Sequence, residues 1–174
     1  MPEPIPPTLF KTRFILLAFL LPVLAFLALG WINRVANHAP NVTFNTITGQ
    51  KLNLKDLQNQ PVLVTFWATD CATCIKEVPE LIKLYQQYHP QGLEIIAVAM
   101  YYDPPNRVLN LSKALQLPYP VALDLDAELA QAFGRVQFTP NTFLIAPDGS
   151  IALNKAGALD LAEVTTLINR YIKG

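Results

Sequence analysis

The chain has 174 residues, of which 52% are hydrophobic, and its 13 basic and 13 acidic residues leave a formal net charge of zero. This balance argues against a nucleic-acid-binding protein, which requires a basic face. The length predicts one domain plus an additional segment.

The first predicted element is a membrane helix over Phe14–Ile32, a run of 19 residues without a charge. At about 1.5 Å per residue this helix is about 28 Å long, close to the ~30 Å hydrocarbon core of a bilayer. Lys11 and Arg13 precede the helix, whereas only Arg34 follows it closely. Because basic flanks stay on the cytoplasmic side, we expect residues 1–13 in the cytoplasm and everything after the helix outside it.

A cleaved signal peptide is the alternative for the same segment. The apolar run exceeds the roughly 7–15 residues of a usual signal-peptide core, and the nearest small-residue cleavage pattern, ANHA at 36–39, lies late. We therefore expect a retained, single-pass anchor in the cell inner membrane, followed by a linker over 33–41 and a periplasmic domain over 42–174. In that oxidising compartment two cysteines can form a disulfide.

The domain after the linker alternates between strand-like and helix-like segments. Residues 41–54 predict a β-hairpin around Thr48–Gln50, and 61–67 is an apolar run typical of a strand buried on both faces. The other expected segments are a short turn or helix at 55–59, helices at 72–88, 106–116, 126–134 and 159–174, and strands at 93–101, 119–124 and on both sides of a Pro-Asp-Gly-Ser turn within 142–153. This order predicts an α/β fold with a mixed central sheet and helices on both faces.

The two cysteines, Cys71 and Cys74, form a CxxC motif where a buried strand turns into a helix. A zinc site needs a second ligand pair, and the two histidines, His38 and His89, lie in the linker and at a helix end. Haem attachment needs a histidine directly after the second cysteine, where Ile75 stands. A purely structural disulfide in so short a loop removes little unfolded-chain entropy. A redox pair is the interpretation that the context favours.

A helix that begins near Cys71 would point its free N–H groups at that sulfur and stabilise the thiolate. Cys74 lies one turn later on the same face, where it can attack a mixed disulfide formed at Cys71. Glu77 continues that face, and its carboxylate can influence the thiol pKa values or pass a proton to Cys74. The alternative for Glu77 is a solvated acid in the first turn of the helix. Pro79 is expected to kink the helix after this turn.

The segment FWATDCATCIKEVP resembles the active-site segment of the thioredoxin superfamily. It is most similar to the membrane-anchored TlpA/ResA type, which includes reductases of cytochrome c maturation and reads roughly F-W-A-T-W-C-x-P-C-x-x-E-x-P. The matching residues are Phe66, Trp67, Ala68, Thr69, Cys71, Cys74, Glu77 and Pro79. Downstream, FTPNTFLIAPDG resembles the family's V-P-x-T-F-L-I-D-x-x-G, in which the proline is cis.

The resemblance covers about residues 40–172 and implies a thioredoxin-like fold with an N-terminal β-hairpin and a helix–strand insertion between 104 and 124. It implies that Trp67, Thr139 and Pro140 lie on the substrate side, with Pro140 opposite the cysteines and Thr139 presenting a backbone edge to an incoming peptide. By sequence alone, Pro140 could also be an ordinary loop proline.

The chain departs from the family pattern at three places. Asp70 replaces the usual Trp before the first cysteine, no proline occupies Ala72-Thr73, and Ala146 stands where the family has an acid. Asp70 could cap the helix or sit as an acid near its N-terminus. Alternatively, its carboxylate disfavours the neighbouring thiolate and so lowers the reduction potential of the pair.

The resemblance implies a thiol–disulfide oxidoreductase that reduces client disulfides, apocytochrome c among them, and receives electrons from an integral-membrane donor. It implies no cofactor beyond the Cys71–Cys74 disulfide and no metal. A peroxiredoxin-like peroxidase is disfavoured because Ala68, rather than Thr, stands three residues before the first cysteine. Related copper chaperones use a wider cysteine spacing and a distant histidine. A binding module of the same fold with vestigial cysteines is the non-enzymatic alternative.

Overall fold

The computed structural model describes residues 37–173 together with five isolated residues, Leu20, Pro22, Leu24, Phe26 and Gly30. The predicted segment 1–13, most of the predicted membrane helix 14–32 and the first part of the linker lie outside the described residues. None of the helices among the described residues has the length and apolar character needed to cross a bilayer. Residues from Ala39 onward form one folded unit.

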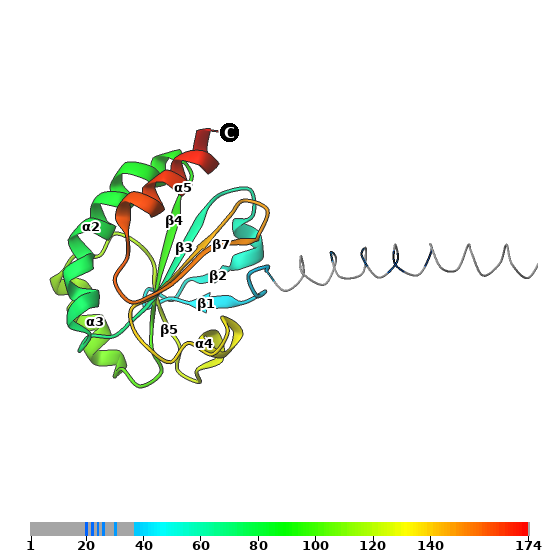
Figure 1. Cartoon of the computed structure of the whole chain (residues 1–174). Helices are drawn as coiled ribbons and strands as arrows, with labels where there is room; N and C mark the ends of the chain where they lie inside the picture. The colour runs from blue at the N-terminus through cyan, green and yellow to red at the C-terminus, as the bar shows by residue number, and fades with distance from the viewer. Residues whose placement is uncertain are drawn as a thin grey trace, which may run out of the picture. The chain divides into compact units, whose positions relative to one another are not determined.

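A five-stranded mixed sheet in the order β5-β4-β3-β6-β7 forms the centre of this unit (Figure 1). The first three of these strands are parallel, whereas β6 runs antiparallel to both β3 and β7. The strands are β3 (Val62–Trp67), β4 (Glu94–Ala99), β5 (Val121–Leu123), β6 (Asn141–Ile145) and β7 (Ile151–Ala156). The mixed sheet predicted from the sequence is therefore confirmed.

The N-terminal hairpin is a separate two-stranded sheet, in which β1 (Thr43–Asn45) pairs antiparallel with β2 (Lys51–Asn53). It is followed by a 3-10 helix, η1 (Leu54–Leu57), which corresponds to the predicted short turn or helix. Gly49, at the tip, has φ +83°, a conformation that glycine adopts without steric cost.

The helices cover both faces of the sheet, as predicted. Figure 1 shows α2, α3 and α5 over one face, and α4 with the hairpin on the other side. Their bounds are α2 (Ala72–Tyr88), followed by the 3-10 helix η2 (His89–Gln91), then α3 (Pro105–Ala114), α4 (Glu128–Ala132) and α5 (Leu161–Lys173).

Strand β3 joins the two halves of the core, because all six of its residues are buried. Its side chains alternate between faces. Leu63 and Trp67 pack in the cluster that contains α2 and α5 residues, whereas Phe66 packs in the cluster that contains α4. On that second side Phe66 meets Phe133 and Phe143 edge-to-face, with ring centroids 5.5 and 6.0 Å away. The strand that leads into the cysteine motif is thus fixed from both sides.

Several elements are shorter than the sequence predicts. Strand β4 ends at Ala99 because Met100–Asp103 forms a turn, closed by a hydrogen bond of 2.9 Å from the Asp103 N–H to the Met100 carbonyl. Helix α4 has only five residues, and Ala127 before it is left-handed, with φ +58°. Helix α2, by contrast, runs through Pro79 without interruption.

Candidate active site

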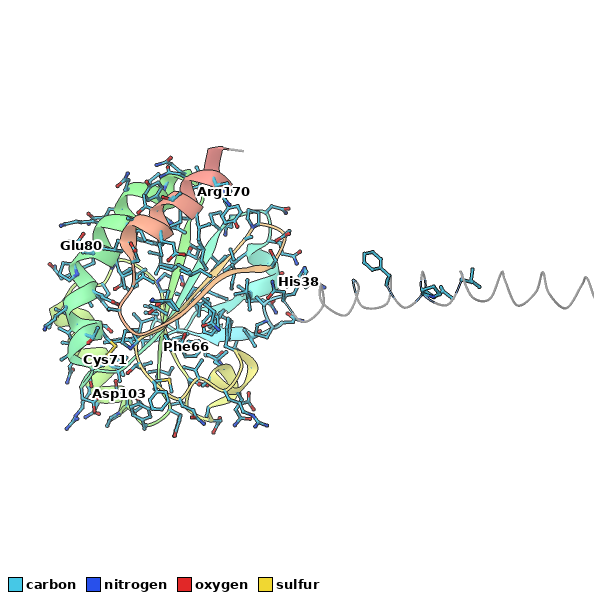
Figure 2. All side chains as sticks on the ribbon, in the orientation of Figure 1. His38, Phe66, Cys71, Glu80, Asp103 and Arg170 are labelled. Carbon is cyan, nitrogen blue, oxygen red and sulfur yellow. A yellow bond between two sulfur atoms is a disulfide. The ribbon has the colours of Figure 1, made fainter. Side chains whose placement is uncertain are left out.

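Cys71 and Cys74 form a disulfide with an S–S distance of 2.06 Å and a Cα–Cα distance of 5.2 Å. Cys71 is half-buried at the surface, whereas Cys74 is 4% exposed and belongs to the core beneath α2. Figure 2 shows Cys71 at the end of the domain where Asp103 also lies. The two sulfurs therefore differ in access: a molecule in solution reaches Cys71 first.

The cysteine pair lies at the N-terminus of α2, as predicted. Cys71 is the N-cap residue, and its Sγ accepts a hydrogen bond of 3.2 Å from the Cys74 N–H. A helix N-terminus stabilises negative charge through its unpaired N–H groups and its dipole. The capping role suggested for Asp70 belongs to Cys71 instead; Asp70 precedes the cap and is exposed. Asp70 is thus a solvent-facing carboxylate directly before Cys71.

A carboxylate from another loop holds the segment before Cys71. Asp103 is buried and accepts two hydrogen bonds from Thr69, one from the backbone N–H at 2.6 Å and one from Oγ1 at 2.7 Å. This clamp joins the loop after β4 to the loop after β3. Asp103 is not among the site residues predicted from the sequence. The one signal that could have revealed the clamp was an acid at the carboxyl end of a buried strand.

Pro140 lies near Cys74, directly before β6, the strand that neighbours β3. The Thr139–Pro140 peptide is cis, as the resemblance implied, and β6 begins directly after it with Asn141 paired to Phe66. Pro140 is buried and Thr139 is half-buried.

A small cavity of about 10 Å³ lies behind the disulfide. Four of the predicted site residues line it: Trp67, Cys74, Glu77 and Pro140. Its volume corresponds to about one water molecule. Tyr119 also lines this cavity, and burial raises the pKa of its phenol above the ordinary value of 10.0. The structure thus gathers these predicted residues on the inner side of the disulfide.

Glu77 is more constrained than a solvated acid in the first turn. It lies in the second turn of α2, is half-buried, and accepts a hydrogen bond of 2.8 Å at Oε1 from the Leu159 N–H. Leu159 belongs to the connection between β7 and α5. Glu77 therefore fixes this connection next to the cysteines, and the sequence pattern gave no sign of it because the partners are 82 residues apart.

A second group of interacting side chains lies at the opposite end of α2. Burial and the neighbouring Glu94 raise the pKa of Tyr85 to about 12, and burial also raises the pKa of the Glu94 carboxyl. The ring of His89 stacks on Tyr85 at 4.3 Å. His89 remains partly exposed while its ring packs on this neighbour.

Comparison with known proteins identifies the family. Residues 35–154 match the family described as AhpC/TSA. The chain belongs to the AhpC/TSA family. The thiol-disulfide oxidoreductase ResA of Bacillus thuringiensis is 35% identical over 68% of this chain and 67% of its own length. ResA of Bacillus subtilis is 32% identical over 75% of this chain and 72% of its own.

Solved structures share the fold. The thioredoxin domain of a thiol-disulfide oxidoreductase from Bacteroides vulgatus superimposes with a TM-score of 0.67 at 24% identity, covering 76% of this chain and 96% of that one. StoA from Bacillus subtilis gives a TM-score of 0.63 at 23% identity, covering 72% of this chain and 93% of that one. The thioredoxin-like fold and the predicted resemblance are confirmed. The protein is a thiol–disulfide oxidoreductase of the ResA type, with Cys71 and Cys74 as its CxxC pair.

Proposed function

We propose that this AhpC/TSA-family protein is a membrane-tethered, extracytoplasmic reductase of disulfides in client proteins. The observation that carries the proposal is the difference in access between the two sulfurs. Half-buried Cys71 caps the helix, and buried Cys74 lies one turn further. A client disulfide can reach the first sulfur, while the second is placed to attack what becomes bonded to it.

The reaction starts from the reduced pair. The Cys71 thiolate attacks one sulfur of the client disulfide, forms a mixed disulfide and releases the other client sulfur as a thiolate. Deprotonated Cys74 then attacks Cys71 Sγ, re-forms the intramolecular disulfide and releases the second client sulfur. The client gains two electrons, and its two thiolates take up the protons that the two cysteines gave up. The Cys74 N–H and the helix N-terminus stabilise the Cys71 thiolate at the start.

The uncharged run Phe14–Ile32 and its basic N-terminal flank support a single-pass anchor in the inner membrane, with residues 42–174 on the periplasmic side. A tether of this kind suits an integral-membrane electron donor that returns two electrons to the Cys71–Cys74 disulfide after each turnover. The resemblance to the cytochrome c maturation branch supports apocytochrome c as one client. No cofactor beyond the cysteine pair is required by this cycle.

Trapping of the mixed disulfide tests the reductase. In the full chain with Cys74→Ala, Cys71 should form long-lived mixed disulfides with client proteins, apocytochrome c included, whereas Cys71→Ala should form none. A non-enzymatic binding module would give no trapped species with either variant. Labelling of Cys71 with a membrane-impermeant maleimide in spheroplasts tests the orientation; labelling only after lysis would contradict the proposed topology.

The reduction potential of the pair tests the direction of electron flow. We expect a value well below that of glutathione, as for a reductant. We also propose that Asp70 helps to lower this potential, although its exposure means that solvent screens the effect. Asp70→Asn should raise the potential slightly, and the difference should shrink in high salt. A strongly oxidising wild-type potential would overturn the assignment as a reductase.

A further inference from the structure

A groove of about 530 Å³ lies between helix α3, the start of β5 and the tip of the N-terminal hairpin. Its volume falls within the roughly 300–1,000 Å³ of small-molecule sites. The Ile47 N–H donates to the Val121 carbonyl at 2.8 Å, which fastens the hairpin to β5, an edge strand of the sheet. None of the described residues that line the groove belongs to the loops that flank Cys71. The groove is therefore separate from the surface around the reactive sulfur.

The walls of the groove combine aromatic and aliphatic surface. The rings of Tyr85, from α2, and Tyr119, from the segment before β5, meet edge-to-face with their centroids 5.9 Å apart. Half-buried Leu109 and Leu117 add aliphatic surface from α3 and the segment after it. Aromatic rings bury large areas and pack on other rings at defined angles. The groove thus suits a ligand with a flat, apolar body.

Lys113 supplies the only charge among the described residues that line the groove. It is exposed and lies in the last turn of α3. Tyr85 contacts Glu94, but that carboxyl group lies outside the lining. A single ammonium group beside apolar walls favours a ligand with one anionic group, and a carboxylate accepts a charge-assisted hydrogen bond from a lysine.

The hydroxyl group of Ser112 lies on the same helix without a bond of its own. Its Oγ is buried and has no hydrogen-bond partner in the described part of the chain. Buried polar atoms without a partner are rare, because each one costs stability. Since Ser112 also lines the groove, a ligand with an oxygen beside α3 would supply the missing partner.

Gln116 lines the groove from a strained position. It follows α3 in the left-handed conformation, with φ +50°. Its N–H donates to the Lys113 carbonyl at 3.2 Å, and the Leu117 N–H donates to the Ser112 carbonyl at 3.1 Å, a pair of bonds that ends many helices. Glycine usually occupies this position, because a side chain there costs energy. Strain of this kind gathers at ligand sites, and the side chain kept here carries an amide into the lining.

Two residues form a wall shared by the groove and the small cavity behind the disulfide. Leu117 and Tyr119 line both spaces. Cys74 and Glu77 line the cavity on the inner side of this wall. Protein interiors are close-packed, so a molecule placed against one side of the wall changes the packing on the other. Occupancy of the groove is therefore connected to the surroundings of Cys74.

We propose that the groove binds a small aromatic monocarboxylate and that this binding is coupled to the redox state of the cysteine pair. The carboxylate lies between Lys113 and Gln116, and the ring packs on Tyr119 and Leu117. Coupling between two sites is reciprocal, so a ligand with different affinities for the oxidised and reduced forms also shifts the reduction potential. This inference goes beyond the proposed function and depends neither on the client nor on the direction of electron flow.

NMR titration of the isotope-labelled full chain in non-ionic detergent micelles tests the site. The probes are naphthoate and its neutral counterpart of the same shape, naphthamide, with the free ligand measured after dialysis. Naphthoate should give saturable shifts of the Thr48, Leu117 and Val121 amide signals. Naphthamide should bind about tenfold more weakly, because it lacks the charge-assisted bond to Lys113. The affinities of the oxidised and reduced proteins for naphthoate should differ about fivefold or more.

Three variants separate ligand binding from folding. Lys113→Met should weaken naphthoate binding about tenfold, whereas Lys155→Met, at an exposed lysine on the opposite edge strand β7, should leave it unchanged. Gln116→Gly relieves the left-handed strain and should raise the urea midpoint. The same variant should bind naphthoate about fivefold more weakly, the loss of one hydrogen bond. A residue with a purely structural role would not weaken binding while stabilising the fold.

Two sets of results would overturn the proposal. Lack of saturable shifts at the groove amides, equal affinity for naphthoate and naphthamide, or an equal loss in Lys155→Met overturns the carboxylate site. Equal affinity of the oxidised and reduced proteins for naphthoate overturns the coupling to the cysteine pair.

Discussion

The Asp103 clamp makes the sharpest test of how the site is held. Asp103→Ala removes both acceptors of Thr69, and hydrogen bonds to a charged group contribute about 1.5–3 kcal/mol each. Thr69 is half-buried, so water replaces part of the loss, and we expect the free energy of unfolding to fall by about 2–4 kcal/mol. Thr69→Val removes only the hydroxyl bond and should cost about 1–2 kcal/mol. Asp103→Asn should cost about 1 kcal/mol, because the amide can accept the N–H and donate to the rotated hydroxyl.

Urea unfolding of the oxidised full chain in detergent micelles measures these differences, with the double variant D103A/T69V closing the cycle. The coupling energy should be about 1–2 kcal/mol, because both single variants remove the same hydroxyl bond. A coupling below about 0.5 kcal/mol would mean that the two side chains act independently. An Asn variant as unstable as the Ala variant would also refute the reasoning, since it would show that hydrogen-bond geometry is not what Asp103 supplies.

Three further predictions concern other parts of the fold. Burial raises the pKa of Glu94, so its stabilising contribution is fully present below the ordinary value of 4.5 and is lost as the pH rises through the raised value. Glu94→Gln should therefore have a higher urea midpoint than the wild type at about pH 7 and a similar one at about pH 3.5; a lower midpoint at neutral pH contradicts this sign. Glu77→Ala should speed hydrogen exchange of the Leu159 amide, measured by NMR, whereas Glu77→Gln keeps the acceptor and the protection; unchanged exchange in both variants would rule out the contact. Phe143 is 2% exposed and packs between two other phenylalanine rings. Phe143→Ala should therefore lower the free energy of unfolding by about 3–5 kcal/mol in the same urea assay. A loss below about 1 kcal/mol would mean that the core repacks around the substituted residue.

The sequence predicted the elements whose pattern is local. The apolar run at 61–67 matches a strand with every residue buried, and the helix at 72–88 has the bounds of α2. Element ends were less accurate where a turn or a left-handed residue, such as Ala127, interrupts a continuing pattern. Composition does not encode that conformation for an alanine.

Within the site, short sequence motifs predicted the cysteines and their neighbours, but no local pattern predicted the contacts between distant loops. Cys71 and Cys74 lie three positions apart in the sequence, and their spacing alone was enough to predict the pair. The bond between Thr69 and Asp103 spans 34 residues. Such a contact depends on which loops the strand order brings together, and that order follows from the packing of the whole sheet.

The Met100–Asp103 turn has a consequence for protein engineering. It is closed by its own backbone bond and fastened by one carboxylate, while its two central side chains point to solvent. Those two positions can be randomised as a cassette with both ends kept, leaving the cysteines and the helix that bears them untouched. Libraries built on this turn would vary the surface of a thiol–disulfide oxidoreductase close to Thr69 without changing its CxxC motif.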